Sequence, residues 1–378
     1  MGITELVLML AIGIPAQEPG NVATKAMPPA PTTAPMPSMA PPTPNPFQPA
    51  PGDPHRDIRE TRLREVKKLT QIGSNAEAYW SWDGKRIIFQ STREGRDCDQ
   101  IYVMNSDGSD QHLASTGKGR TTCGYFMPGD KRIIYASTHG GGVDCPPSPP
   151  FTPGTYRWPV FPSYDLYTAR PDGTDVKPWL AHEGYDAEAT VAPNGKQVVF
   201  TSERSGDIDL WVADINGKHL KRLTDAVGYD GGAVWSPDSK LIAWRTNYPK
   251  GQEAASKYRD LLKQHLVEPM EMDIWVMNAD GTGKRQLTHL LGAAFAPVFS
   301  PDGKSVVFSS NWEDREGKGR YFELYKLNLD GTGLERLTYT GNFNSFPHFS
   351  PDGKKLVWVS GREASAPRQF NVFIAEYH

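Results

Sequence analysis

Acidic and polar side chains recur ahead of short apolar runs, and they are the first candidates for ligand binding. They are Asn75, Glu77, Thr121, Cys123, Asp186, Glu188, Asp230 and Asn344. Carboxylates gathered around one point would hold a hard cation such as Ca²⁺, or accept hydrogen bonds from a polyol or an amine. A structural role is the alternative. Arg93 lies 16 residues after Glu77 and Arg204 lies 16 residues after Glu188, where each arginine would pair with its acid.

A second set of side chains follows the same apolar runs. It consists of Arg93, His139, Arg204, Tyr248, Trp312 and Arg362. Three guanidinium groups, an imidazole and two aromatic rings facing one point would clamp a carboxylate or a peptide C-terminus. A solvated rim is the alternative. His139 is the candidate general base, although a lone histidine is more often structural.

These positions recur because the chain contains a repeated unit. Six copies of a turn-and-strand motif are present, at Ser81–Phe89, Met127–Tyr135, Ala192–Phe200, Ser236–Trp244, Ser300–Phe308 and Ser350–Trp358. Their starts are 46, 65, 44, 64 and 50 residues apart, which gives a base period of about 44 with two insertions of about 20. A period near 40 to 45 residues with only strand signals is typical of a β-propeller blade.

Each unit predicts four strands. The Pro-Asp-Gly turn joins a first strand to a β-branched second strand. A third strand such as Met272–Asn278 follows, and a fourth ends in Leu-Thr, as in Arg336–Thr338. The last unit stops after its third strand, whereas Arg62–Thr70 is an unpaired copy of the fourth. The sequence therefore predicts an all-β, six-bladed β-propeller over residues 57–378, closed by an N-terminal outer strand in the last blade, which removes exposed sheet edges.

The Ser-Pro-Asp-Gly-Lys turns and the strands of Asp-Ile-Trp-Val-Met-Asn type resemble the TolB-like propeller family, whose repeat is of the PD40 type. The resemblance covers about residues 62–378 and implies contacts with envelope proteins of the Tol-Pal kind. TolB itself carries an α/β domain before its propeller, where this chain has a proline-rich segment, so the resemblance is to the family and not to TolB itself. In the same family, such repeats precede a hydrolase domain in dipeptidyl peptidases, and similar propellers form oligogalacturonate lyases.

The N-terminal residues predict export. Residues 1–17 contain an apolar run, Leu6–Pro15, of signal-peptide length that is too short to span a bilayer, although Glu5 stands where signal peptides carry Lys or Arg. Residues 18–56 are expected to form a disordered tether, because the 12 prolines between Pro28 and Pro54 favour extended polyproline II over a core. We expect a periplasmic or otherwise exported protein.

Both long insertions fall between the second and third strands of their repeats, on the face that carries the candidate side chains. Val143–Ser163 is rich in proline and aromatic residues, and Gln252–Val267 has helical spacing. The side chains concerned are Phe151, Tyr156, Trp158 and Phe161 in the first insertion, and Tyr258, Leu261, Leu262 and Leu266 in the second. We expect the insertions to wall or cap the mouth of the central channel; packing of the helical stripe on its own blade is the alternative.

The chain has three cysteines, Cys98, Cys123 and Cys145, and all are predicted to lie on this same face. In an exported protein two of them would pair. We expect a disulfide in which Cys123 joins either neighbour, leaving one free thiol. A zinc site is disfavoured because no Cys-x-x-Cys spacing is present.

Composition and motifs narrow the function. With 41 basic against 44 acidic residues and no basic cluster, nucleic acid is not an expected partner. A mean hydropathy of −0.53 excludes a multi-span membrane protein, and hydrolase motifs such as Gly-x-Ser-x-Gly are absent.

We therefore expect a monomeric, non-catalytic propeller that binds a protein or peptide of the bacterial envelope through the insertion-bearing face, with no cofactor unless Ca²⁺ sits at the channel mouth. The alternatives are a carbohydrate- or small-molecule-binding propeller and a lyase-like propeller enzyme that uses His139 with a bound cation. The candidate ligand-binding residues are Glu77, Arg93, His139, Asp186, Glu188, Arg204, Asp230 and Arg362.

Overall fold

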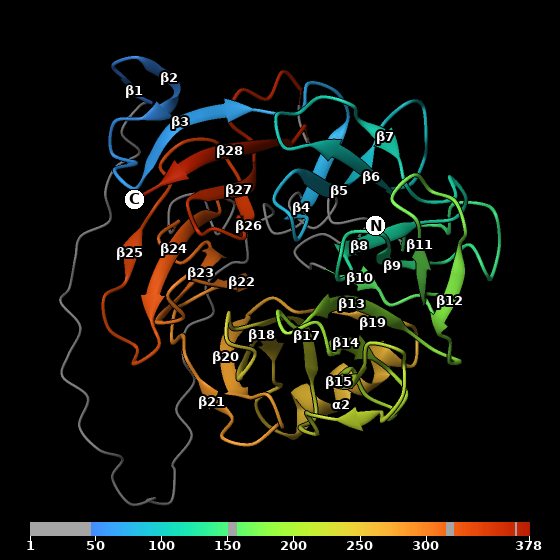
Figure 1. The fold of residues 1–378 in the computed structure, drawn as a ribbon. Coiled ribbons are helices and arrows are strands. Elements are labelled where there is room, and N and C mark those ends of the chain that lie inside the picture. Colours follow the sequence, from blue (N-terminus) through green and yellow to red (C-terminus); the bar gives the residue numbers. More distant parts are fainter. Residues whose placement is uncertain (1–46, 150–156, 315–320, 367–368) are drawn as a thin grey trace, which may run out of the picture.

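The computed structural model describes residues 47–149, 157–314, 321–366 and 369–378, and these form six four-stranded antiparallel sheets around a central axis (Figure 1). The strands of each blade are given from its inner to its outer edge. Blade 1 consists of β4 (Ser74–Trp80), β5 (Arg86–Thr92), β6 (Gln100–Asn105) and β7 (His112–Leu113), and blade 2 of β8 (Thr121–Phe126), β9 (Ile133–Ser137), β11 (Asp165–Ala169) and β12 (Lys177–Leu180). Blade 3 consists of β13 (Asp186–Val191), β14 (Gln197–Ser202), β15 (Asp209–Asp214) and β16 (Lys221–Arg222).

Blade 4 consists of β17 (Tyr229–Trp235), β18 (Leu241–Asn247), β20 (Asp273–Asn278) and β21 (Arg285–Gln286). Blade 5 consists of β22 (Ala294–Phe299), β23 (Ser305–Ser310), β24 (Glu323–Asn328) and β25 (Glu335–Arg336). Blade 6 consists of β26 (Asn344–Phe349), β27 (Lys355–Ser360), β28 (Asn371–Tyr377) and β3 (Leu63–Lys68). The predicted all-β, six-bladed propeller is confirmed.

The core lies between adjacent blades, because each sheet buries both of its faces. Ile88, Ile101 and Val103 of blade 1, for example, pack with Phe126 and Tyr135 of blade 2. A strand that is buried on both faces reads as a continuous apolar run rather than an alternating one. This is why the second strands carry sequences such as Ile-Ile-Phe and Val-Val-Phe.

The turn between the two inner strands of each blade follows from the Ser-Pro-Asp-Gly motif. In blade 5, Ser300 N–H donates to Ser305 O at 2.8 Å, and Ser300 Oγ donates to Asp302 Oδ1 at 2.5 Å. The fourth turn residue has a left-handed φ between 57° and 72° in every blade, which glycine adopts without a steric cost. These residues are Gly84, Asp130, Gly195, Ser239, Gly303 and Gly353.

The same turns connect neighbouring blades. A Cβ added at Gly353 would lie 2.6 Å from Pro301 Cβ of the preceding turn, so the proline ring lies directly against the glycine. A Cβ at Gly84 would lie 3.5 Å from Pro351 Cδ, which brings blade 6 against blade 1. The turns therefore form a continuous ring at one end of the molecule.

The N-terminal strand β3 closes the propeller, as predicted. It pairs antiparallel with β28. Thr70 Oγ1 donates to Asn371 Oδ1 at 3.1 Å and accepts the Val372 N–H at 2.9 Å. Thr224 makes the equivalent two contacts inside blade 3: its hydroxyl donates to Asp209 Oδ1 at 3.2 Å and accepts the Leu210 N–H at 2.9 Å. The closing strand is thus held by the hydrogen bonds of an ordinary blade.

The propeller begins ahead of the boundary predicted at residue 57. Strands β1 (Pro49–Ala50) and β2 (Asp53–Asp57) form a hairpin beside β3, and Val66 N–H donates to Asp53 Oδ2 at 3.2 Å. The buried Glu60 then accepts two hydrogen bonds from Arg362, at 2.9 and 3.1 Å. Residues 47–56, predicted to be tether, are therefore packed on the propeller; residues 1–46, with the predicted signal peptide, lie outside the described residues.

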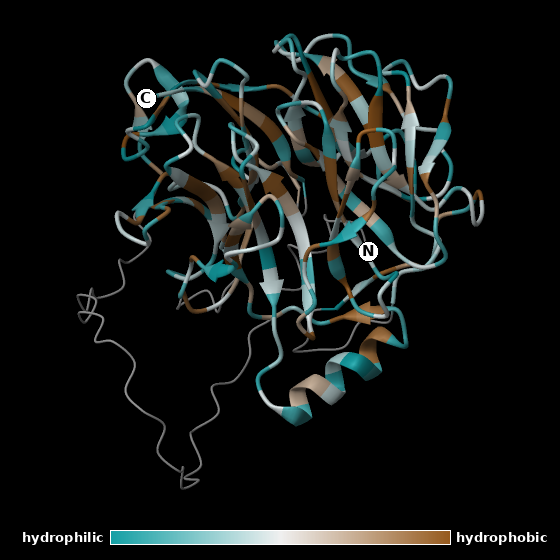
Figure 2. Ribbon diagram, turned by 60° about the horizontal axis from the view of Figure 1, so that its bottom comes forward, coloured by the Kyte–Doolittle hydropathy of each residue, from teal (hydrophilic) through white to brown (hydrophobic). Residues whose placement is uncertain are grey.

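The two insertions meet over one end of the axis. Strand β10 (Trp158–Pro159) pairs with β19 (Leu266–Val267), and helix α2 (Gln252–Leu262) lies at the edge of the body (Figure 2). The Tyr258 hydroxyl of α2 lies 2.6 Å from Asp207 Oδ1 of blade 3. The apolar stripe therefore packs beyond its own blade; Phe151 and Tyr156 of the first insertion lie outside the described residues. No helix in the described ranges is long and apolar enough to cross a membrane.

Candidate ligand-binding channel

All six inner strands contain a β-bulge at the same position. In blade 1 the pairing register shifts between Ala76 and Tyr79, and the other blades shift at the equivalent place. A bulge commonly re-aims a side chain, and a left-handed φ at a non-glycine residue costs about 1 kcal/mol or more. The bulged residues have φ between 48° and 59° and line one cavity on the axis: Glu77, Cys123, Glu188, Gly232, Ala296 and Phe346.

A second ring lines the same cavity two residues further along each strand. It consists of Tyr79, Tyr125, Thr190, Val234, Val298 and His348. The cavity is narrow, with a volume of about 70 Å³. Its polar groups are unevenly placed, since the bulges of blades 1 to 3 contribute two acids and a thiol, whereas those of blades 5 and 6 contribute Ala296 and Phe346.

Arg245 reaches the axis because blade 4 has glycine at its bulge. Arg245 lies on the neighbouring strand β18, and a Cβ on Gly232 would lie 2.4 Å from its Nη1. The guanidinium forms an ion pair with Glu188 and donates from Nη2 to Tyr229 Oη at 2.8 Å. Burial lowers the pKa of Arg245, but the carboxylate of Glu188 outweighs it and holds this pKa well above its ordinary value.

Glu188 is held by several donors. Its Oε2 accepts hydrogen bonds from Thr201 Oγ1 at 2.8 Å, from Gly232 N–H at 2.9 Å and from Tyr229 Oη at 3.0 Å, while Oε1 faces Arg245. Opposite charges that are buried together neutralise each other, although Arg245 Nε has no hydrogen-bond partner among the described residues. The Glu188 and Arg245 pair is therefore a fixed part of the channel wall.

Glu77 is the contrasting case. Its side chain is buried, at 4% exposure for the residue, and Oε2 has no hydrogen-bond partner among the described residues. Burial raises the pKa of Glu77 to about 7; hydrogen bonds from Cys123 and the charge of Arg245 oppose this shift, and the charge of Glu188 adds to it. At neutral pH the recess thus contains a carboxyl group that is about half ionised.

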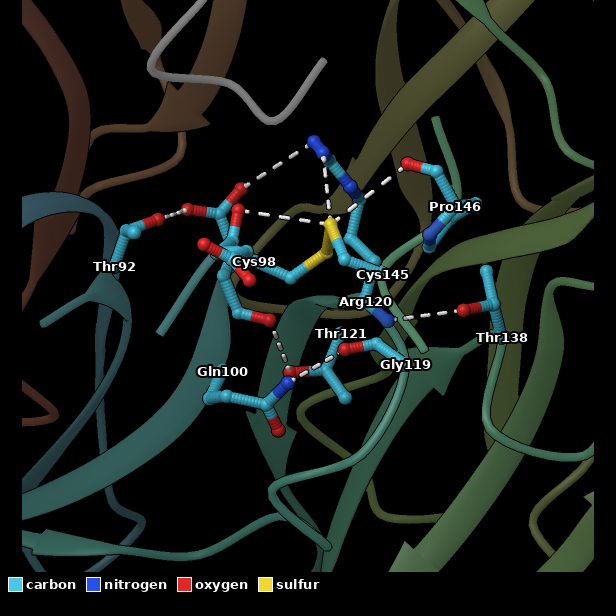
Figure 3. Close-up of a disulfide and its surroundings, with 11 residues drawn as sticks. Thr92, Cys98, Gln100, Gly119, Arg120, Thr121, Thr138, Cys145 and Pro146 are labelled. Carbon is cyan, nitrogen blue, oxygen red and sulfur yellow. Dashed lines mark hydrogen bonds and ion pairs between the residues drawn. A yellow bond between two sulfur atoms is a disulfide. The ribbon is translucent and has the colours of Figure 1, made fainter. Parts of the chain in front are cut away.

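Cys123 is a free thiol, and the prediction that it would form the disulfide is wrong. The bond joins Cys98 to Cys145, whose Cα atoms are 5.7 Å apart (Figure 3). These two lie in loops of adjacent blades, whereas the bulge places Cys123 on the axis. Burial and the two nearby carboxylates raise the pKa of the Cys123 thiol well above its ordinary value, so it is not an activated nucleophile.

Two tyrosines and a histidine form an aromatic cluster in the second ring. The ring centroids of Tyr79, Tyr125 and His348 lie 5.3 to 5.8 Å apart. Trp80 N–H donates to His348 Nδ1 at 3.1 Å, so the neutral imidazole carries its proton on Nε2, which lies 3.3 Å from Tyr125 Oη. Burial lowers the pKa of His348 to about 4, so the ring is uncharged at neutral pH.

Aromatic side chains pack against one another at the insertion-bearing end of the channel. Phe295, Phe322, Phe343 and Phe346 contact one another with ring centroids 5.2 to 6.5 Å apart. Trp158 of β10 packs on Tyr229 at 5.3 Å, above the buried ion pair. Trp158 of the first insertion thus packs over this end of the channel.

The turn-bearing end has the larger hollow. A cavity of about 400 Å³ adjoins the narrow one, and both are lined by Tyr125, Val191, Trp235 and His348. Trp80, Trp82 and Phe349 also line the wider cavity. Its rim is formed by the exposed turn prolines Pro193, Pro237, Pro301 and Pro351. We call this wider cavity the aromatic mouth and the narrow one the Glu77 recess.

Among the predicted ligand-binding residues, only Glu77 and Glu188 line these cavities. Their predicted pairing with arginines is wrong, because each arginine instead contacts the residue two positions before the glutamate. Arg93 donates to Asn75 Oδ1 at 2.7 Å, and Arg204 donates to both carboxylate oxygens of Asp186 at 2.8 and 2.9 Å. The bulges are the reason, because they turn the two glutamates away from their own blades.

The remaining candidates lie within their own blades and do not converge. Trp244 Nε1 and Tyr248 Oη donate to Asp230 Oδ1 at 2.7 and 2.8 Å, and burial raises the pKa of Asp230 to about 7. His139 Nδ1 lies 2.7 Å from Ser137 Oγ, and burial lowers its pKa. Arg362 is held by Glu60, as described above. In the described part of the chain no group of three or more His, Cys, Asp or Glu is placed to hold a metal ion, and Ca²⁺ stays a prediction.

Sequence reasoning missed Arg245, Tyr229, Tyr125 and His348. One signal was available, because the bulged residue stands four positions before the start of the turn motif in every repeat. Alignment of the repeats would place Glu, Cys, Glu and Gly in consecutive blades of one ring. The position of Arg245 could not be read in this way, since it depends on the space left by a glycine on another strand.

The blades, bulges and axial channel define a six-bladed propeller, and known proteins share its repeats. Residues 260–376 match the model of the TolB beta propeller domain, PD40. The uncharacterized protein Atu1656 of Agrobacterium fabrum is 36% identical over 283 residues, which cover 67% of this chain and 90% of that protein. The chain therefore belongs to the TolB-like β-propeller family.

Other likenesses cover less or show the fold alone. YuxL, an uncharacterized peptidase of Bacillus subtilis, is 28% identical over 167 residues, which are 39% of this chain and 25% of that protein. The chain therefore spans about a quarter of that relative. The structure of TolB from Acinetobacter baumannii aligns with a TM-score of 0.51 at 17% identity, over 80% of this chain and 64% of that one.

Proposed function

We propose that this propeller is a non-catalytic, exported binding protein whose aromatic mouth receives a segment of a protein or peptide of the bacterial cell envelope. The observation that carries the proposal is the mouth itself, a hollow of about 400 Å³ lined by Trp80, Trp82, Trp235 and Phe349. Tryptophan and other aromatic side chains contribute most to binding when they form a pocket that excludes water. Membership of the TolB-like propeller family supports an envelope partner.

The rim favours an inserted segment over a flat contact. Its prolines have fixed φ angles, and Pro237, Pro301 and Pro351 each lie near a glycine of the next blade's turn. Beside Pro193, the Asn194 N–H donates to Ser239 Oγ of the next blade. A rim that is already ordered costs little conformational entropy when a ligand binds. A loop or an extended peptide would fit a hollow of this size, because a side chain can enter it while the backbone rests on the rim.

Two observations support export. The Cys98–Cys145 disulfide is of a kind that persists in oxidising compartments. The apolar run Leu6–Pro15 has signal-peptide length. Both agree with a partner in the envelope.

The non-catalytic assignment rests on the state of the reactive groups at the channel. The Cys123 thiol has a raised pKa, and His348 is neutral and buried. Glu188 is paired with Arg245. Covalent catalysis needs an activated nucleophile, and the raised pKa keeps the Cys123 thiol protonated although Glu77 lies beside it.

Charge placed on the rim tests the proposal. The double variant Pro193→Glu, Pro237→Glu adds two carboxylates at exposed positions of the mouth, and a partner would have to bury them. We expect saturable capture of an envelope protein by the full chain to weaken at least about tenfold, because an unpaired buried charge is costly. Quantitative mass spectrometry of proteins captured from envelope extract, followed by calorimetry with the purified partner, measures the loss.

The matched control adds the same charges at the other end. Ile72 and Leu291 are 55% and 73% exposed in the loops that lead into β4 and β22. The variant Ile72→Glu, Leu291→Glu should capture the partner as the unmodified chain does. Loss of the partner in this control instead of the rim variant would move the binding surface to the insertion-bearing end.

A further inference from the structure

The Glu77 recess has a property that the aromatic mouth does not explain. Glu77 Oε2 is buried without a hydrogen-bond partner in the described ranges, and it lines the cavity. Buried carboxylate oxygens are almost always hydrogen-bonded, because an unsatisfied acceptor loses its hydration without return. A missing donor at this position therefore points to a ligand that supplies one.

The charges around the recess also leave Glu77 unmatched. The carboxylate of Glu188 and the guanidinium of Arg245 form an ion pair with each other. Among the described residues, Glu77 makes no ion pair, and His348, which also lines the recess, is neutral. One negative charge is thus left over when Glu77 is ionised, and a ligand with one positive charge would balance it.

The walls and the size of the recess restrict that ligand. The aromatic rings of Tyr79 and Tyr125 line the recess, and the faces of such rings attract cations. A volume of about 70 Å³ has room for a compact head group but not for a large one. The recess adjoins the aromatic mouth, so a head group on an apolar stem would place its stem among the mouth's tryptophans.

We propose that Glu77 binds a primary ammonium group, which enters through the aromatic mouth on an alkyl stem. An ammonium group supplies both the N–H donor that Oε2 lacks and the missing positive charge. It could belong to a lysine side chain of a partner or to a free alkylamine. The lysine source rests on the proposed function and would define which segment of the partner enters the channel.

Calorimetry with n-butylammonium chloride tests the site on the full chain at constant ionic strength. We expect saturable binding at pH 7 that the uncharged 1-butanol does not reproduce. Glu77→Gln keeps the shape and removes the charge, so binding should weaken about ten- to hundredfold, as expected for loss of a charged hydrogen bond. Equal affinity in Glu77→Gln, or equal binding of 1-butanol, would overturn the site.

Asp230→Asn is the matched control. Asp230 is also a buried carboxyl with one unpartnered oxygen, but it does not line either cavity. Binding of n-butylammonium should be unchanged in this variant, and an equal loss there would overturn the assignment to Glu77. A second measurement needs no variant, because an ammonium ion favours ionised Glu77 and binding should release protons at pH 7. The measured enthalpy should then change with the ionisation enthalpy of the buffer, and an enthalpy independent of buffer would count against the site.

A peptide arm separates the two sources of the ammonium group. Acetyl-Ala-Pro-Lys-Pro-Ala-amide is compared with the same peptide carrying norleucine in place of lysine. Tighter binding of the lysine peptide than of n-butylammonium assigns the site to a polypeptide, and the reverse order assigns it to a free amine. If the rim variant loses an envelope protein while Glu77→Gln keeps it, the proposed function stands and the ammonium site falls. If n-butylammonium binds but no protein is captured, the ammonium site stands and the proposed function falls.

Discussion

At the scale of single residues, the bulge position determines what the channel can do. One left-handed residue per inner strand places a side chain on the axis, and its identity changes from blade to blade: Glu, Cys, Glu, Gly, Ala, Phe. The fold requires the bulge but does not determine which side chain stands there. A binding site can therefore be changed here without altering the blades.

The state of Glu77 should appear in the pH dependence of stability. Its pKa is raised from 4.5 to about 7 in the folded chain, mainly by burial, with Cys123, Glu188 and Arg245 as the charged or titratable neighbours. The folded state then binds more protons than the unfolded state between these values, so Glu77 destabilises the fold increasingly as pH rises from about 4.5 to 7.

Glu77→Gln should remove this term. The variant should match the unmodified chain near pH 4 and exceed it at pH 8 by at most about 3 kcal/mol, which corresponds to the shift in pKa. Urea unfolding of both proteins at pH 4.5, 6, 7 and 8 measures the difference directly. A difference that stays constant with pH would show that Glu77 titrates normally.

Gly232 should tolerate no side chain, because Arg245 occupies the space beside it. A Cβ at Gly232 would lie 2.4 Å from Arg245 Nη1, and the residue has φ 59°. We expect Gly232→Ala to displace the guanidinium from Glu188 and to cost about 3 kcal/mol or more in the free energy of unfolding.

Gly95→Ala separates the steric effect from backbone strain. Gly95 has φ 71°, and a Cβ there would meet nothing within 4 Å. It should cost only about 1 kcal/mol, as left-handed strain alone does. Equal losses in the two variants, measured by denaturant midpoints, would mean that Arg245 adapts to the added methyl group.

At the scale of elements, the loops between second and third strands distinguish this propeller from a plain one. The disulfide joins the loops of blades 1 and 2, and β10 in that same blade 2 loop pairs with β19, which follows α2 in the loop of blade 4. Together with the phenylalanines of blades 5 and 6, their described residues pack over one end of the channel.

Loss of the disulfide should destabilise the propeller. The bond joins residues that are 47 positions apart, for which loop-closure entropy gives at most about 4 kcal/mol. We expect the double variant Cys98→Ser, Cys145→Ser to lose 2 to 4 kcal/mol, about the usual effect of a native disulfide. Denatured, unreduced protein should show one thiol per chain, that of Cys123, and three thiols would contradict the bond.

At the scale of the whole molecule, the ring depends on a single non-covalent closure. Strand β3 supplies the outer strand of blade 6, and the hairpin before it adds Glu60 as a partner for Arg362. Every other blade is made from one continuous segment of chain. The stability of the ring should therefore depend on hydrogen bonds across this one junction.

Thr70→Val should cost as much as the same change inside a blade. The Thr70 hydroxyl bridges Asn371 and Val372, and the variant leaves both without their partner. We expect a loss of about 1 to 3 kcal/mol in the free energy of unfolding. Thr224→Val, which removes the equivalent bridge in blade 3, is the matched control. A cost near zero for Thr70→Val beside a normal cost for Thr224→Val would show that the closure contributes little.

The repeat made most of the fold predictable. Pro-Asp-Gly turns, β-branched second strands and Leu-Thr endings act over a few residues, so six blades and the closing strand could be read from the sequence. The role of Arg62–Thr70 could be predicted because the last repeat lacks a fourth strand and this segment is an unpaired copy of that strand. The hairpin at residues 49–57 was missed, because its proline content is also that of an extended tether.

The site depended on contacts that no local pattern contains. Sequence alone identified Glu77 and Glu188 as candidates, but their partners were wrong because a bulge changes which face a side chain takes. Cys98 and Cys145 pair since two loops of adjacent blades approach, and Arg245 reaches Glu188 since Gly232 leaves space. Turn and strand preferences act between neighbours along the chain and so determine the blades. Which residues meet on the axis depends on bulges, loop packing and vacant volume, and these exist only once the ring has closed.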